Sequence, residues 1–236
     1  MIARAFYIPK DGKDGEDANF VANGWGVIGG IDAGIFARQL MKHSAALVKR
    51  WPCGLSNPVE ILEEALSKTT AKGTSTACVL SLKGKWLHAA VLGDSGFAVV
   101  RNKVIYRSPD QQSEFNAPYQ LGKASPTSCS TLDALRITVA VKTGDLVVLG
   151  TDGLFDNMYN KELEGVIASS LRDGQDSPEG LARNIAEEAH KLSLEAGRES
   201  PFYLKCVEEH GKEKCPPGGK RDDITVIVAR VTCTCG

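Results

Sequence analysis

The order of secondary structure elements in the sequence predicts an α+β protein with antiparallel sheets packed between helices. Residues 74–108 read as a meander of β-rich runs, broken at turns such as Lys83-Gly84 and Asn102-Lys103. Helical periodicity occurs in two blocks, one before this meander and one after the later strands, so helices and strands do not alternate. No repeat or linker divides the chain, and we expect residues 1–236 to form a single domain.

The helical blocks carry recognisable N-terminal signals. Asp32 can cap the first helix, Asn57 precedes a proline at the start of the second, and Ser177-Pro178 begins the last. We expect helices over residues 33–50, 58–71, 161–173 and 177–197. We expect further strands over residues 4–9, 17–22, 135–141, 146–150 and 223–231, and a surface loop, rich in Pro, Gly and charge, over residues 199–220.

Composition and charge indicate an ordinary globular protein. The 236 residues are 42% hydrophobic and 24% charged, which suffices for a sizeable core. Acids and bases are interspersed and the net charge is −1, so we expect neither a nucleic-acid partner nor membrane binding. No apolar run reaches the ~18 residues of a membrane span. The N-terminus lacks the apolar core of a signal peptide, and we expect an intracellular monomer.

The seven cysteines are an odd number, and the chain has no N-x-S/T glycosylation acceptor. This pattern is unlike a secreted disulfide framework, so we expect reduced thiols. Cys233 and Cys235, with Cys206 and Cys215 upstream, lack the paired C-x-x-C spacing of a zinc site. We expect a frayed terminus there instead.

Acidic residues recur at the ends of apolar runs, at Glu16-Asp17, Asp94, Asp152 and Asp222-Asp223. Taken singly, each of them fits a turn or a helix cap. Carboxylates that converge at strand ends repel one another unless a cation neutralises them, and oxygen ligands with few histidines favour Mg²⁺ or Mn²⁺ over zinc. The recurrence of these acids therefore predicts a metal site.

Five stretches, "GEDANF", "GTSTACVL", "LGDSGFAVVR", "LGTDGLFDNM" and "RDDITVIVARV", occur in an order and spacing that resemble the metal-dependent type 2C Ser/Thr protein phosphatases. The resemblance covers nearly the whole chain, and "NAPYQLG" with "GTDGLFDN" is most similar to the compact branch found in mitochondria and chloroplasts. It implies a four-layer α-β-β-α sandwich of two antiparallel sheets flanked by helical pairs, with a metal cleft at one edge.

The resemblance also implies roles for particular residues. Asp152 and Asp222 match direct ligands of one metal, and Asp94 matches an acid associated with a third, weaker metal. Glu16 and Asp17 match the pair that holds the water shell of the metals. Asp223 adjoins a ligand position and is expected only to shape the turn.

The chemistry implied is hydrolysis of phosphoserine and phosphothreonine in a phosphoprotein substrate, with two Mn²⁺ or Mg²⁺ ions that activate the attacking water. No protein nucleophile is expected, because none of the cysteines lies in a phosphate-cradling loop and no Ser-His-Asp set is apparent. A leaving-group acid is not identifiable among the four histidines.

The chain departs from the family where an A-D-G-V-G-G-W-like motif supplies the Asp that bridges both metals. Here the sequence reads "GWGVIGGIDAGIFARQLM", with the glycine pair Gly29-Gly30 but no matching Asp. Three explanations remain open: a natural variant with impaired metal binding, a segment missing from this sequence, or replacement by Asp32. If metal binding is impaired, the alternative function is a catalytically impaired relative that binds phosphoproteins or acts as a scaffold.

The phosphate-binding Arg of the family is also unmatched, because Gly12 stands about where it would fall. Lys10 or Lys13 could serve there as a point charge, without the bidentate geometry of a guanidinium.

Overall fold

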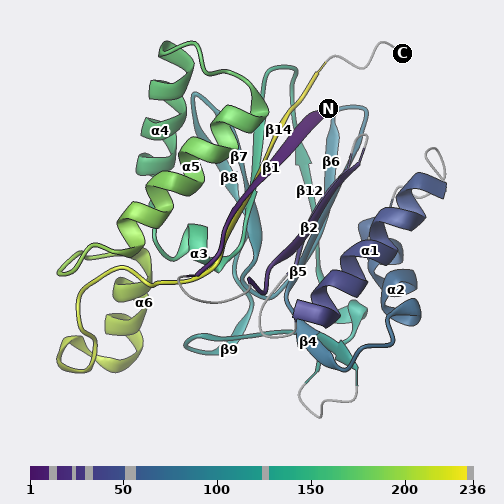
Figure 1. The fold of residues 1–236 in the computed structure, drawn as a ribbon, viewed down its shortest axis with the longest axis horizontal. Helices are drawn as coiled ribbons and strands as arrows, with labels where there is room; N and C mark the ends of the chain where they lie inside the picture. The colour runs from purple at the N-terminus through teal and green to yellow at the C-terminus, as the bar shows by residue number, and fades with distance from the viewer. Residues whose placement is uncertain (11–14, 23–24, 30–33, 51–56, 124–127, 233–236) are drawn as a thin grey trace.

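The structure is a computed structural model that describes residues 1–10, 15–22, 25–29, 34–50, 57–123 and 128–232 (Figure 1). In these ranges the protein is α+β, with antiparallel sheets and six α-helices. The helices are α1 (Gly34–Arg50), α2 (Pro58–Lys68), α3 (Asp152–Phe155), α4 (Asn160–Arg172), α5 (Pro178–Ser193) and α6 (Pro201–His210). None of the described helices is long and apolar enough to cross a membrane.

Two five-stranded antiparallel sheets form the centre of the fold. The first has the order β1 (Ile2–Ile8), β14 (Ile224–Arg230), β13 (Leu146–Gly150), β7 (Gly96–Arg101), β8 (Lys103–Arg107). The second has the order β12 (Leu135–Ala140), β6 (Trp86–Leu92), β5 (Ala77–Lys83), β3 (Trp25–Gly29), β2 (Ala18–Ala22). Two small antiparallel pairs complete the strands, β4 (Gly73–Ser75) with β11 (Leu121–Lys123) and β9 (Gln112–Glu114) with β10 (Ala117–Pro118).

Three apolar clusters explain why the helices and sheets pack together. One joins α1 and α2 to β5 and β6, and a second joins α4 and α5 to β13 and β14. The third contains residues of both large sheets, such as Leu80, Phe97 and Leu149. Successive residues of β13 alternate between clusters, because side chains of a strand point to opposite faces: Val148 packs with the helices and Leu149 with the other sheet. Figure 1 shows the two helical groups on opposite sides of the strands.

The expected helices and their caps are largely confirmed. The Asn57 side chain accepts a hydrogen bond from Val59 N at 3.1 Å, and Ser177 accepts one from Gly180 N at 3.0 Å. Helices α2 and α5 end earlier than expected, at Lys68 and Ser193. The expected cap Asp32 lies outside the described residues.

The prediction of a surface loop over residues 199–220 is wrong for its first half, which forms α6. Ser200 caps this helix through a 3.1 Å hydrogen bond from Tyr203 N, and Pro201 follows at its first position. The expectation of reduced thiols is also wrong for two cysteines, because Cys206 and Cys215 form a disulfide. The chain folds back after α6 and brings their Cα atoms to 5.9 Å. Cys78 and Cys129 are free, while Cys233 and Cys235 lie outside the described residues.

An ion pair between the partly exposed Arg101 and the buried Asp145 connects β7 to the turn before β13. Arg101 donates two hydrogen bonds of 2.7 Å to the Asp145 carboxylate, and Lys142 N donates a third at 2.8 Å. Burial on its own raises the pKa of Asp145, but the hydrogen bonds and charge of Arg101, together with the Lys142 backbone, outweigh burial and lower that pKa.

We expect Asp145→Asn to lower the free energy of unfolding at neutral pH and to matter less in acid. A carboxyl whose folded pKa is depressed contributes stability above its unfolded pKa of ~3.9, and this contribution is lost as the pH falls through the folded pKa. Urea unfolding of both proteins at pH 7, 4 and 3 measures the difference. A difference that stays constant down to pH 3 would show that the carboxylate charge contributes nothing.

Candidate metal centre

The two strands that carry the expected metal ligands are neighbours in one sheet. Gly150, the last residue of β13, pairs with Val226 near the start of β14. Asp152 follows β13 and Asp222 precedes β14, so antiparallel pairing places the two carboxylates side by side. Gly153 allows this close approach, because a Cβ at this position would lie 2.0 Å from the Asp223 carbonyl oxygen.

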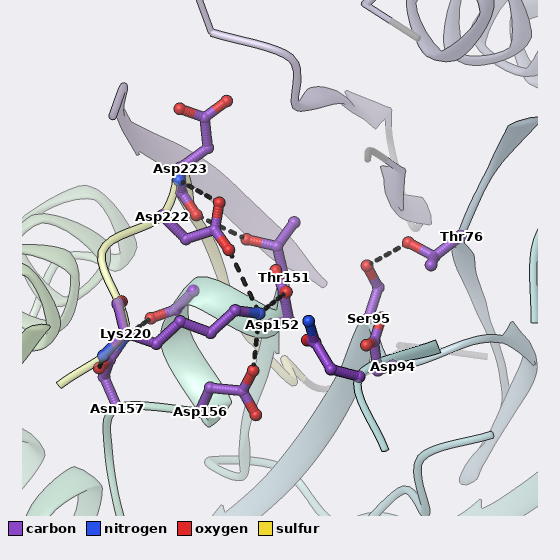
Figure 2. Close-up of polar contacts among 12 residues, drawn as sticks. Thr76, Asp94, Ser95, Thr151, Asp152, Asp156, Asn157, Lys220, Asp222 and Asp223 are labelled. Atoms are coloured by element: carbon purple, nitrogen blue, oxygen red, sulfur yellow. Dashed lines mark hydrogen bonds and ion pairs between the residues drawn. The ribbon is translucent and has the colours of Figure 1, made fainter. Parts of the chain in front are cut away.

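One ammonium group occupies the centre of this carboxylate cluster (Figure 2). Lys220 Nζ forms an ion pair with Asp152, lies 2.9 Å from Asp156 Oδ2 and lies 3.2 Å from Asp222 Oδ2. The Lys220 side chain is 16% exposed, and those of Asp152 and Asp156 are 6% exposed. The Lys220 ammonium, which is the counter-charge of the carboxylates, is therefore largely shielded from water.

Asn157 fixes the backbone that presents this lysine. Its side-chain amide donates a 2.8 Å hydrogen bond to Lys220 O, and its carbonyl oxygen accepts one of 2.8 Å from Lys220 N. The same amide also donates to Gly153 O at 2.9 Å, within the turn that contains Asp152. Asn157 thus joins the segment before β14 to the segment after β13.

The electrostatics of the cluster require a cation. Burial raises the pKa of Asp152 to about 6, although the charge of Lys220 acts in the opposite direction. For Lys220, burial alone would lower the pKa, but the charges of Asp152, Asp156 and Asp222 outweigh it and raise that pKa. The carboxylates thus hold Lys220 in its charged form, and the charge of Lys220 favours the ionised form of Asp152.

Asp94 lies at the edge of the cluster and has unused acceptor capacity (Figure 2). Its Oδ2 accepts a 3.0 Å hydrogen bond from Gln112 Nε2, whereas its buried Oδ1 has no partner among the described residues. Burial, followed by repulsion from Asp152 and Asp156, raises the pKa of Asp94 to about 7. A buried oxygen without a donor fits a position that faces a cation.

The N-terminal acids reach the same region through β14. Asp17 accepts a 2.8 Å hydrogen bond from Thr225 Oγ1, and burial raises its pKa well above the usual value. Asp223 accepts from Lys10 N at 2.5 Å and from Glu16 N at 2.6 Å. Asp223 therefore does more than shape its own turn, because it anchors the segment that carries Glu16 and Asp17.

Of the two lysines expected near the phosphate, Lys10 and Lys13, the structure describes only Lys10. Lys10 Nζ lies 3.9 Å from Asp222 Oδ1, and its side chain is 41% exposed, which places a cation at the rim of the cluster. Lys13 lies outside the described residues, as do residues 30–33, where the family motif with the bridging Asp would fall.

Sequence reasoning missed Lys220 and Asp156 as members of the cluster. Asp156 follows Asp152 by four residues, the spacing that places two side chains on one face of a helical turn. Lys220 stands two residues before Asp222, so the sequence indicates that it lies near this acid. The direction of its side chain depends on the hydrogen bonds between Asn157 and the Lys220 backbone.

The donor chemistry of the cluster fits a hard divalent cation, because all three ion-pair partners of Lys220 offer carboxylate oxygen. Within the described ranges, however, no three His, Cys, Asp or Glu side chains are close enough together to hold one metal ion. The carboxylates instead surround the Lys220 ammonium, which supplies the positive charge that a metal would otherwise supply.

Comparison with known proteins identifies the family. The chain is 41% identical to "Probable protein phosphatase 2C 80" of Arabidopsis thaliana, over 98% of the chain and 59% of that relative. It is 36% identical to the human "Protein phosphatase PTC7 homolog", over 92% of the chain and 79% of that relative. No protein-family model matches the chain.

Solved structures agree with this result. The photosystem II phosphatase PBCP is 31% identical, with a TM-score of 0.90 over 99% of both chains. The catalytic domain of the phosphatase PstP, solved with two manganese ions, shares the fold at 15% identity and a TM-score of 0.63. The chain belongs to the metal-dependent protein phosphatase 2C family of protein Ser/Thr phosphatases, as its sequence motifs predict. It spans little more than half the length of the Arabidopsis relative.

We expect Lys220→Met to destabilise the metal-free protein by ~3–5 kcal/mol, because removal of one partner leaves buried carboxylates without a counter-charge. Thermal and urea unfolding in EDTA measure the loss. Added Mn²⁺ should restore part of the stability, since a bound cation supplies the missing charge. Lys191→Met is the matched control, because Lys191 is 66% exposed and its pair with Glu188 contributes little. Equal stability of the two variants in EDTA would contradict the proposed charge balance.

Proposed function

We propose that this chain is a metal-dependent phosphatase that hydrolyses phosphoserine and phosphothreonine in proteins. The observation that carries the proposal is the convergence of Asp152, Asp156 and Asp222 on one cation position where β13 and β14 pair. Membership of the phosphatase 2C family supports it.

In this proposal Asp152 and Asp222 would hold a divalent ion directly, and Asp94 would offer its unpaired oxygen to a weaker site. Glu16 and Asp17 would accept hydrogen bonds from the water around the ions. Two Mn²⁺ or Mg²⁺ ions, when bound, would activate the attacking water and neutralise charge on the phosphoryl group.

Two lysines act beside these acids. Lys10, at the rim, is placed to contact a phosphate oxygen as a point charge. A divalent ion bound by Asp152 and Asp222 would displace Lys220 from these two acids, and Asp156 would remain as its partner. Lysine has no fork of donors, so neither residue reproduces a bidentate guanidinium.

The proposal includes the finer features expected from the family. Residues 1–236 form one domain, and the three apolar clusters support a four-layer α-β-β-α arrangement. The protein acts as a monomer on a phosphoprotein. Of the two organelles in which the compact branch occurs, similarity to a photosystem II phosphatase favours the plastid.

An impaired phosphatase that binds phosphoproteins is the second candidate. It is favoured by the position of Lys220 at the centre of the cluster and by the lack of a three-ligand group within the described ranges. The alignment with the Arabidopsis relative extends over 249 residues, more than the 236 of this chain, so that relative has residues that this chain lacks.

The direct test is hydrolysis of p-nitrophenyl phosphate and of a phosphothreonine peptide. We expect activity that requires Mn²⁺ or Mg²⁺ and disappears with EDTA, and we expect Asp152→Asn to abolish turnover. The fold should tolerate this change, because Lys220 keeps Asp156 and Asp222 as partners. Circular dichroism and melting in EDTA provide the control for folding. Activity that survives complete chelation would refute the metal-dependent mechanism.

A second test replaces residues 28–30, "IGG", by the family-like segment "ADGVGGW". We expect calorimetry to show two tightly bound Mn²⁺ ions in the variant, where the present chain lacks a bridging side chain for the second. Loss of one ion from a two-metal site should cost several powers of ten in rate, at ~1.4 kcal/mol of activation free energy for each power of ten. Tight binding of two ions and ordinary turnover by the unaltered chain would show that another acid, with Asp32 the first to test, fills the role.

A further inference from the structure

A pocket of about 540 Å³ opens beside the metal centre, between the end of β8, the turn of α3, the start of α4 and the start of α6. Its apolar lining includes Phe155, Met158 and Pro201. Arg107 packs against one wall, with its guanidinium carbon 3.4 Å from the centre of the Phe155 ring. The volume is in the usual range for a specific ligand site, at ~300–1,000 Å³.

The charged lining of the pocket is mainly positive, with Arg107, Lys161 and Lys205 against a single acid, Asp110. Asp110 is already neutralised, because it lies 2.7 Å from Lys205 Nζ and 3.4 Å from Arg107. Lys161 is exposed and has no hydrogen bond or ion pair within the described part of the chain. The pocket therefore offers a positive charge to a ligand.

Lys205 retains capacity for a further acceptor. Its ammonium contacts Asp110 Oδ2 at 2.7 Å and Asp156 Oδ1 at 3.2 Å, which accounts for two of its three N–H donors. A carboxylate that enters the pocket can accept the third hydrogen bond while it pairs with Lys161.

Asp156 connects this pocket to the metal centre. One of its oxygens contacts Lys205 in the pocket, and the other contacts Lys220 in the carboxylate cluster. Because the two ammonium groups flank a single carboxylate, they lie closer together than three residues of extended chain, which span ~10 Å. A peptide whose phosphoresidue is at the metal centre can therefore place a neighbouring side chain in the pocket.

We propose that this pocket binds an acidic side chain of the phosphoprotein substrate, two or three residues from the phosphoresidue. The proposal rests on the proposed function and adds a preference for acidic sequences around the site of hydrolysis. Met158, Phe155 and Pro201 contact the methylene groups of the bound side chain, and Lys161 and Lys205 pair with its carboxylate.

The test uses fluorescent phosphothreonine peptides in matched pairs, with Glu or Gln placed two or three residues to either side of the phosphoresidue. Binding is measured by anisotropy with Mn²⁺ in the unaltered chain, with peptides that carry a non-hydrolysable phosphonate in place of the phosphate, and kcat/KM is measured with the phosphothreonine peptides. We expect the Glu peptide of at least one pair to bind about two- to five-fold more tightly, the effect of one exposed ion pair. The preference should shrink in 1 M salt, where the screening length falls to ~3 Å.

Variants of Lys161 identify the pocket as the source of the preference. Lys161→Ala should lower the ratio of Glu to Gln affinity toward one, Lys161→Glu should invert it, and Lys161→Arg should retain it. Lys42→Glu is the matched control, because Lys42 is exposed on α1, in the helical group on the opposite side of the sheets (Figure 1). The control should leave the ratio unchanged.

Equal binding of every Glu and Gln pair, or a preference that persists in Lys161→Glu, would overturn the proposal. Hydrolysis and pocket binding can fail separately. If the unaltered chain hydrolyses neither p-nitrophenyl phosphate nor the peptides, yet the Lys161-dependent preference remains, the proposed function is wrong and the pocket stands as a phosphoprotein-binding site. If hydrolysis occurs without the preference, only the pocket assignment is wrong.

Discussion

Mutual repulsion among carboxylates is the constraint on which this structure depends. Asp152 and Asp156 follow β13, and Asp222 precedes β14, the neighbouring strand of the sheet. Their convergence costs free energy unless a cation lies among them. Lys220 supplies that cation in the metal-free protein. The hydrogen bond from Lys220 N to Asn157 and the close contact between Gly153 and Asp223 lie where the ends of β13 and β14 meet. The backbone contacts therefore hold the charged groups in the positions in which their charges balance.

The rigidity of the site comes from the strands beneath it. All residues of β13 are buried, as are those of β14 up to its last residue, because one face packs against helices and the other against the second sheet. Close packing on both faces leaves little freedom for the loops that begin at these strand ends. Asp223 extends this support to the N-terminal segment through two backbone hydrogen bonds.

Asp156 links two regions of different chemistry. Lys220 and the carboxylate cluster lie on one side of it, where charge balance favours a divalent cation, and Lys205 lies on the other, in a pocket with excess positive charge. A phosphatase that combines both would select a substrate by its phosphate and by an acid nearby. The chain belongs to the phosphatase 2C family, whereas its proposed preference among phosphoproteins rests on residues such as Lys161, which lies outside the five stretches that resemble the family.

The sequence alone determined the α+β class, the helix caps Asn57 and Ser177, and the phosphatase motifs that contain Asp94, Asp152 and Asp222, because these follow from local periodicity, capping chemistry and ordered short motifs. It did not predict α6, which lies in a stretch rich in Pro, Gly and charged residues, or the Cys206–Cys215 disulfide. Nor did it predict the contacts of Lys220, or of Asp223 with the N-terminal backbone. Only the tertiary structure decided the contacts of Lys220 and Asp223, since these depend on segments brought together by folding: Asn157 and Lys220 are 63 residues apart, and Glu16 and Asp223 are 207 apart. Periodicity and propensity act over a few residues, whereas the direction of a buried charge is determined by whichever distant groups surround it.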